Sequence, residues 1–379
     1  MRNLSALACV ARTAACDRRL RRHEWRLVSR SIYVLCLLTA LLAALPAKAV
    51  DYCVSNAVEF QAALNSAALN SSGFDNIVLV GGAYSTADNG DAPFTYNSVT
   101  AHSVNIVGGF APACAGYGAP SLLSGDGLSA VFESHSTQGG VGLSRLIIEN
   151  GLVVAPEDNN GVGLRMNTAI AENGEISVED CIIRTNNNQN LSSSYGGFYL
   201  VAGSSLHFDN NLVYGNYAAA GAGAAGFIFV ESGASAYVAN NTISANTSGD
   251  TSQGAGMIVS AIDVDSAFLF NNIFWGNTRY GLMLPTSGTV ALQFNDYGTL
   301  QGTPSSDINV GNVSLAPQFV NRSNGDFHLS ASSPLFGLGV GGGLLNGLID
   351  LDGHTLSSHR VDLGAYQDTI FLAGFETTY

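Results

Sequence analysis

The segments SVEDCIIRTN (177–186), HFDNNLVYGN (207–216), YVANNTISAN (237–246) and FLFNNIFWGN (268–277) repeat one pattern along the chain. Each ends in asparagine, and these asparagines lie 30, 30 and 31 residues apart. A more distant copy, GLSRLIIENG (142–151), precedes them. A period near 30 residues with strand-forming composition predicts a solenoid in which each repeat forms one coil. Helical solenoids are excluded because the segments have no helical period, and propeller blades need roughly 40 residues.

Alternation within each copy separates inward from outward side chains. Two positions are apolar in every copy, which predicts two stacked core columns. They are Ile176, Leu206, Ala236 and Ala267, and then Val178, Phe208, Val238 and Leu269. The intervening positions vary in polarity and are expected to face outward. The paired asparagines that follow, as at Asn210 and Asn211, predict a corner where the amides hydrogen-bond to the next coil. A second strand family follows glycine, as at Gly197 and Gly226, so each coil holds at least two strands.

One end of such a stack needs a cover, because open strand edges aggregate. The pattern after Cys53 supplies it: Asn56 and Glu59 form a capping box, and an apolar stripe runs from Val58 to Ala67. The sequence therefore predicts an all-β fold, a single parallel β-helix (solenoid) with an N-terminal capping helix. The expected domains are a signal peptide (1–49), an N-terminal cap (50–72), the β-helix (73–335) and a C-terminal cap with a tail (336–379).

The N-terminal segment has the composition of an export signal. Arginines precede the apolar run IYVLCLLTALLAAL (32–45), and Pro46-Ala47-Lys48-Ala49 follows it. This predicts a secretory signal peptide cleaved after Ala49, since a membrane span needs ~20 residues. An uncleaved anchor is the alternative. The chain is therefore expected to be secreted or held at the cell surface, with no membrane span after cleavage.

Export permits disulfide bonds. Cys53 and Cys114 both lie near the N-terminal end of the predicted fold, and we expect them to pair. Cys181 interrupts a strand pattern and is expected to be a buried thiol.

The charge of the chain restricts its partners. Past residue 49 it carries six arginines, no lysine and 27 of its 29 acidic residues. Such a chain does not bind nucleic acid by neutralising phosphates, and it is repelled by anionic membranes. A neutral glycan, a cationic surface or a calcium ion remains open as a partner. No metal site or cofactor is predicted, because Asp350-Leu-Asp352-Gly353 lacks the remaining ligands of a calcium loop and is expected to be a turn. We expect a monomer.

The two ends of the exported part resemble bacterial secreted proteins of the pectin-lyase-like superfamily. CVSNAVEFQAAL (53–64) is similar to their N-terminal cap, and DFHLSASSPL (326–335) with RVDLGAY (360–366) resembles their choice-of-anchor C-terminal region. That region usually has an aspartate after Ser-Pro, where this chain has Gly337. The resemblance implies a right-handed β-helix. It leaves function open, since the superfamily contains lyases, hydrolases, adhesins and scaffolds.

Candidate catalytic residues are few. The resemblance to pectate lyases implies an arginine or lysine base with calcium on clustered aspartates. Arg145, Arg165 and Arg184 lie in the early coils, but none adjoins such a cluster, and the polygalacturonase motifs are absent. The best candidate group of catalytic residues faces outward. Glu179 and Asp209 share a column in consecutive coils, so their backbones are expected ~4.8 Å apart, and His207 lies on the same face. The alternative is an ordinary solvated face of an acidic protein.

Aromatic residues supply the second candidate surface. Arg184, Tyr214 and Trp275 fall in one column beyond the corner, and Tyr237 follows His207 by one coil. Flat rings on rigid strands stack on sugar faces. Packed surface aromatics are the alternative. We therefore expect a non-catalytic glycan- or surface-binding module. The alternative is a polysaccharide lyase or glycoside hydrolase, which would place its site on the Glu179, His207 and Asp209 face.

Overall fold

The computed structural model describes most of the chain beyond the predicted signal peptide. The described residues are 51–154, 161–168, 174–191, 195–221, 223–252, 254–263, 266–285, 290–304, 308–342, 349–356 and 360–367. The predicted signal peptide and its cleavage site lie outside them, as does the C-terminal tail after residue 367.

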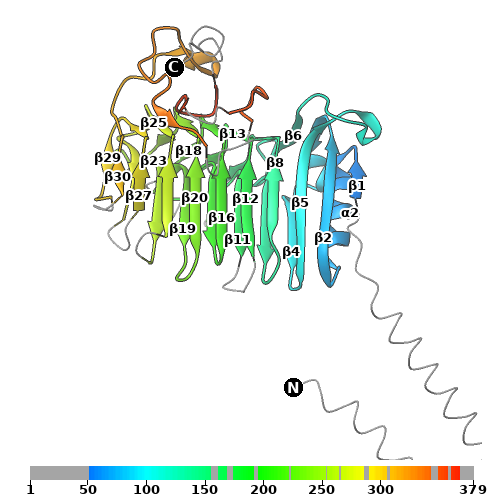
Figure 1. The fold of residues 1–379 in the computed structure, drawn as a ribbon. Helices are drawn as coiled ribbons and strands as arrows, with labels where there is room; N and C mark the ends of the chain where they lie inside the picture. Colours follow the sequence, from blue (N-terminus) through cyan, green and yellow to red (C-terminus); the bar gives the residue numbers. More distant parts are fainter. Residues whose placement is uncertain are drawn as a thin grey trace, which may run out of the picture. The chain divides into compact units, whose positions relative to one another are not determined.

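Three long parallel sheets form the walls of a right-handed β-helix (Figure 1). Sheet A contains β1 (Asp51–Val54), β2 (Ser72–Val80), β5 (Ala101–Phe110), β8 (Val141–Ser144), β12 (Glu175–Glu179), β16 (Ser205–Asp209), β20 (Ser235–Ala239), β24 (Ala267–Phe270), β27 (Val290–Gln293) and β30 (Asn309–Val310). Sheet B contains β3 (Gly82–Ser85), β6 (Ser121–Ser124), β9 (Leu146–Glu149), β13 (Ile182–Arg184), β17 (Leu212–Tyr214), β21 (Thr242–Ser244), β25 (Ile273–Trp275) and β28 (Asp296–Tyr297).

Sheet C closes each coil. It contains β4 (Phe94–Ser98), β7 (Phe132–Ser136), β11 (Leu164–Thr168), β15 (Phe198–Ala202), β19 (Gly223–Val230), β23 (Ala255–Ala261), β26 (Tyr280–Met283) and β29 (Leu300–Gln301). Between sheets B and C lies a narrow four-stranded sheet of β10 (Leu152–Val153), β14 (Asn187–Asn188), β18 (Tyr217–Ala218) and β22 (Thr247–Ser248). A typical coil therefore passes through A, B, the narrow sheet and C before it returns to A.

The predicted columns are confirmed by the strand register. Phe208 pairs with Val178 on one side and with Val238 on the other, and all three side chains are fully buried. Phe208 also contacts the ring of Phe198 from sheet C across the interior, with the centroids 4.7 Å apart. The repeating inward positions thus fill the coil with apolar side chains.

Stacked asparagines hold the corner between sheets A and B. The Asn241 Oδ1 atom accepts both the backbone N–H and the side-chain amide of Asn211, at 2.8 and 3.1 Å. Its own amide donates to the Phe208 carbonyl and to Asn272 Oδ1. Asn240, directly before it, has φ +53°, a left-handed conformation that asparagine tolerates better than most residues. The predicted corner is confirmed, and the amide chain continues to Asn295.

The N-terminal end is covered as expected. Helix α2 (Ala57–Ala68) begins at Asn56, whose side chain accepts the Glu59 N–H, while Glu59 accepts the N–H of Ser55. Its buried face includes Phe60 and Leu64, whereas Val58, which was expected in the apolar stripe, is 65% exposed. Within the described part of the chain, no helix has the length and apolar character needed to cross a bilayer.

Both cysteine predictions are confirmed. The Cys53–Cys114 disulfide joins β1 to the short helix η2 (Pro112–Cys114). Cys181 is free and buried, and burial raises the pKa of its thiol to about 12, so it is inert.

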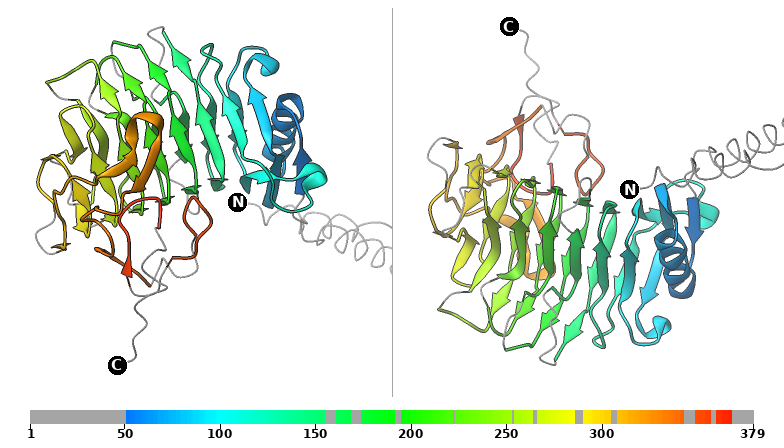
Figure 2. Two further views of the ribbon diagram at one scale, coloured as in Figure 1. Left: turned by 90° about the horizontal axis from the view of Figure 1, so that it is seen from above. Right: turned by 90° about the horizontal axis from the view of Figure 1, so that it is seen from below.

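The segment after β30 folds back along the coils, as the orange and red ribbon in Figures 1 and 2 shows. It contains the hairpins β31 (Phe319–Asn321)–β32 (Asp326–Leu329) and β33 (Gly339–Val340)–β34 (Arg360–Val361). Ile273 of sheet B packs with Leu329, Leu335 and Leu363 of this segment. The C-terminal segment therefore covers the outer face of sheet B and its corner with sheet A.

Candidate functional site

The predicted polar residues meet on the outer face of sheet A. Glu179 pairs in register with Asp209, and His207 with Tyr237. His207 Nδ1 lies 3.5 Å from Asp209 Oδ2, and His207 Nε2 lies 3.9 Å from Glu175 Oε1. Glu175 was not predicted, although it precedes Ser177 by two residues and so shares its face.

Burial and hydrogen bonding shift the pKa values of two of these groups, Asp209 and His207. Asp209 was expected to face solvent, but it is only 9% exposed, and its Oδ1 atom accepts the backbone N–H of Ala239. Burial raises its pKa, although a hydrogen bond to His207 opposes the shift. The bond to Asp209 in turn raises the pKa of His207, against the effect of burial. Chemically, this cluster is an imidazole between carboxylates that can donate or accept a proton.

An aromatic ladder runs from this cluster along sheet A. His207 stacks on Tyr237 with centroids 5.2 Å apart, and Tyr237 stacks on Phe268 at 5.4 Å, with interplanar angles of 19° and 13°. The rings of successive coils are nearly parallel, so each ring packs face to face on the next. The next position in the column is Ala291. Because alanine has no ring, the aromatic ladder ends at Phe268.

A hollow of about 240 Å³ lies at this end of the ladder. Its walls include Tyr237, Phe268 and Ala291 from sheet A, and Val340 and Gly342 from the C-terminal segment. Gln293 also lines the hollow and supplies an amide. The site therefore combines one aromatic face with polar hydrogen-bonding capacity, the usual makeup of a small-ligand pocket.

The other predicted binding residues contact protein. Tyr214 packs on Phe327 of the C-terminal segment, with centroids 4.9 Å apart, and its hydroxyl accepts a hydrogen bond from Arg184. Arg184 also pairs with Glu149 at 2.5 Å. Trp275 packs beside the apolar cluster between sheet B and the C-terminal segment. The column forms as predicted, while its role in sugar binding stays a prediction.

The sequence also carries an aromatic stack that was not predicted. On the outer face of sheet C, Tyr195, Tyr199 and Phe227 lie with their rings 5.0 to 5.6 Å apart and nearly parallel. Phe229 extends the stack. The alternation in the segments GFYLV (197–201) and GFIFV (226–230) was the available signal. This second stack provides a matched control for the ladder on sheet A.

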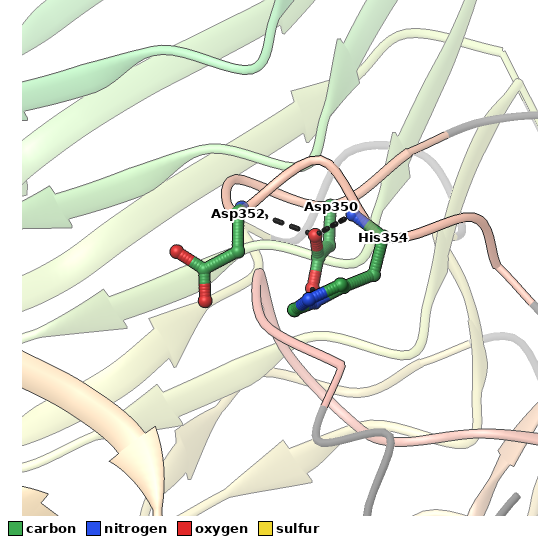
Figure 3. A group of neighbouring side chains, drawn as sticks. All are labelled: Asp350, Asp352 and His354. Atoms are coloured by element: carbon green, nitrogen blue, oxygen red, sulfur yellow. Dashed lines mark hydrogen bonds and ion pairs between the residues drawn. The ribbon is translucent and has the colours of Figure 1, made fainter.

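A possible metal cluster lies in the C-terminal segment (Figure 3). Asp350, Asp352 and His354 each place a ligand atom within 4.8 Å of the others. However, Asp350 Oδ1 accepts the backbone N–H groups of Asp352 and His354, and Oδ2 accepts that of Gln367. The carboxylate holds a tight turn, which confirms the predicted turn.

Another histidine links two parts of the C-terminal segment. His328 lies between Asp326 and Asp352, with N–O distances of 2.7 and 2.8 Å, and its ring packs on Tyr366. Burial alone lowers the pKa of His328, but hydrogen bonds to Asp352 and Asp326 outweigh it and leave the pKa above its ordinary value. The protonated ring therefore ties β32 to the Asp350 turn.

We expect this link to make stability depend on pH. A raised folded-state pKa stabilises the fold fully below the unfolded value of about 6.5, and the contribution declines as pH rises through the folded value. Thermal unfolding of the wild type and of His328→Gln between pH 6 and 9 measures it. The stability difference between the two proteins should shrink with rising pH. A difference independent of pH would contradict the role assigned to His328.

Comparisons with known proteins address the fold. The profile of the family described as "Right handed beta helix region" matches residues 129–297, which contain all five repeated segments. Among solved structures, the crystal structure of pectate lyase Pel9A is similar at 14% sequence identity and a TM-score of 0.34, over 86% of this chain and 98% of that one. A comparison with curated protein sequences found no match.

Proposed function

We propose that this protein is an exported or cell-surface β-helix that binds a glycan on the outer face of sheet A. The Phe268 ring, which ends the ladder and lines the hollow of about 240 Å³, carries the proposal. Tyr237, stacked on it, holds the ring in place. The C–H face of a pyranose stacks on such a ring, and the Gln293 amide is placed to bind its hydroxyls.

The charge balance favours a neutral glycan. Glu175, Glu179 and Asp209 lie on the face from which the ladder starts, and the exported part is strongly acidic overall. An acidic polysaccharide would be repelled by this field, whereas a neutral one is not. The ring platform and the acid cluster thus together select uncharged sugars.

The test is the Phe268→Ala variant. Removing the ring should weaken binding of a neutral oligosaccharide about tenfold, equal to roughly 1.4 kcal/mol, since truncating a residue that contributes substantially to binding costs more than about 1 kcal/mol. Isothermal titration of the exported part against neutral glycans and polyuronates, with and without calcium, measures it. Phe227→Ala removes a ring from the equivalent stack on sheet C and should leave affinity unchanged. Equal affinity in all three proteins would refute the proposed site.

A second candidate is a glycan-cleaving enzyme that uses the neighbouring polar cluster. The coupled, raised pKa values of His207 and Asp209 favour it, because perturbed pairs of this kind occur in acid–base sites. Formation of shorter glycans by the wild type in the same titrations, and its loss in the His207→Gln variant, would support cleavage. Binding without product supports the non-catalytic module.

A further inference from the structure

One residue beside the hollow at Phe268 changes its charge within the physiological pH range. His207 begins the aromatic ladder on sheet A, and an unperturbed histidine titrates at about pH 6.5. Its ring stacks on Tyr237 with the centroids 5.2 Å apart and an interplanar angle of 19°. Tyr237 in turn stacks on Phe268, and these two residues both line the hollow. His207 is not among the described residues that line it, so an effect of His207 on a bound molecule passes through Tyr237.

Carboxylates surround the His207 ring on the strands of sheet A. On β16 itself, Asp209 Oδ2 lies 3.5 Å from His207 Nδ1, while the other Asp209 oxygen accepts a backbone N–H of β20. On β12, Glu175 Oε1 lies 3.9 Å from His207 Nε2, and the charge of Glu179 also acts on the ring. On β20 the neighbour is Tyr237. Within the described part of the chain these are the ionisable groups around His207, and the hydrogen bond to Asp209 raises the pKa of the ring above its usual value.

The aromatic stack on sheet C has the same order of residue types but a permanent cation. Arg165 pairs in register with Tyr199, and Tyr199 with Phe227, so a cation, a tyrosine and a phenylalanine follow one another from coil to coil. On sheet A a histidine stands in place of the arginine. Arginine keeps its charge at physiological pH, whereas histidine gains or loses it. Of these two stacks, only the one that leads to the hollow therefore has a first member whose charge depends on pH.

Protonation of His207 strengthens its contact with Tyr237. A cation over the face of an aromatic ring is attracted by the π system at distances up to about 6 Å from the centroid, and the neutral imidazole lacks this attraction. Tyr237 lies between the His207 and Phe268 rings, so a tighter stack restricts the position of this wall of the hollow. A wall that is already in place binds a ligand more tightly, because less side-chain freedom is lost on binding.

We propose that His207 is a positioning residue for the glycan site, and that its protonated ring fixes Tyr237 and makes the site bind more tightly in acid. The inference rests on the proposed glycan-binding function. Because the pKa of His207 is raised, the effect is complete below about pH 6.5 and is lost as pH rises through the raised value. A bound glycan should in turn raise this pKa further, since the coupling between two binding equilibria is reciprocal.

Isothermal titration of the chain without its predicted signal peptide, at pH 6 and at pH 9, tests the inference. The probes are glucan, mannan and xylan hexasaccharides, which are neutral and have no titratable group of their own in this range. We expect the wild type to bind about two- to fivefold more tightly at pH 6, the size of a cation–π contact at a partly exposed site. NMR titration of the His207 ring, with and without the bound hexasaccharide, should show the rise of its pKa.

His207→Phe is the matched variant, because it keeps a ring on Tyr237 without a charge. At both pH values it should bind with the affinity of the wild type at pH 9. A melting temperature close to that of the wild type would show that it is folded, and the wild-type measurements need no variant. Equal wild-type affinity at the two pH values, or the same pH dependence in His207→Phe, would overturn this inference and leave the glycan function standing. If no hexasaccharide binds at either pH, the proposed function fails and the inference fails with it.

Discussion

Replacing Phe208 with aspartate is expected to lower the free energy of unfolding by about 5 kcal/mol or more. The Phe208 side chain is fully buried in the stacked column of sheet A and contacts Phe198 from sheet C. Truncating a buried phenylalanine alone costs about 3–5 kcal/mol, and a buried carboxyl group without a hydrogen-bond partner adds to this loss. The total approaches the stability of a typical domain, about 5–15 kcal/mol.

Denaturant unfolding of the chain without its predicted signal peptide measures this effect. Ile262→Asp is the matched control, because its side chain is 48% exposed and follows the β23 strand at the surface. A surface substitution of this kind usually changes stability by less than about 0.5 kcal/mol. Similar losses at the two positions would show that the column is not the core of the coil.

The Asn241→Ala variant should lose about 3–6 kcal/mol, the second largest effect. Three buried groups each lose a hydrogen bond: the backbone N–H of Asn211, the carbonyl of Phe208, and the side-chain amide of Asn211, which keeps its bond to the Val178 carbonyl. Each unmet buried group costs about 1–3 kcal/mol, and the amide chain passes through fully buried positions that water does not reach. The corner between sheets A and B then loses its link between consecutive coils.

The same unfolding measurement tests the asparagine prediction. Asn324→Ala, in the exposed η3 helix (Arg322–Asn324), is the control and should be close to neutral. Loss of stability below about 1 kcal/mol in Asn241→Ala would mean that the stacked amides contribute no more than exposed ones.

The coils were predictable because the same residue types recur in the sequence once per coil. Phe208, Val238 and Leu269 recur with the coil length, and a parallel register places equal positions beside each other. The disulfide followed from two cysteines at one end of the same stack. The columns depend on neighbours in the repeat and so follow from spacing, whereas the disulfide lies before the repeats and followed from the position of its cysteines.

The C-terminal segment follows no period, and the sequence therefore did not reveal where it lies. Asn210 contacts Ile349 across 139 residues, and Thr242 contacts Ala365 across 123. Asp209, which the alternation alone placed in solvent, is only 9% exposed. Contacts with the C-terminal segment lie beside it, at Asn210. They also give Tyr214 an aromatic neighbour, Phe327, that no column analysis contains.

The aromatic ladder ends at Phe268 because the repeat breaks there. The spacing of the stacked asparagines falls from 31 residues to 23 between Asn272 and Asn295. The next outward side chain is Ala291 instead of a ring. The repeated segments predicted Tyr237 and Phe268 in one column, but they ended before Ala291, the position at which the column loses its ring.

The two ends of the stack differ in how they present backbone to a second molecule. Strands of sheet A have four or five residues from β8 to β27 and only two in β30, whereas helix α2 packs at the opposite end. A neighbouring copy that approaches β30 meets too few unpaired N–H and C=O groups to continue the hydrogen-bond ladder. The short last strand thus disfavours end-to-end association of copies into fibrils. Such growth is a hazard for parallel β-helices, because the end strand of one copy can pair with that of the next.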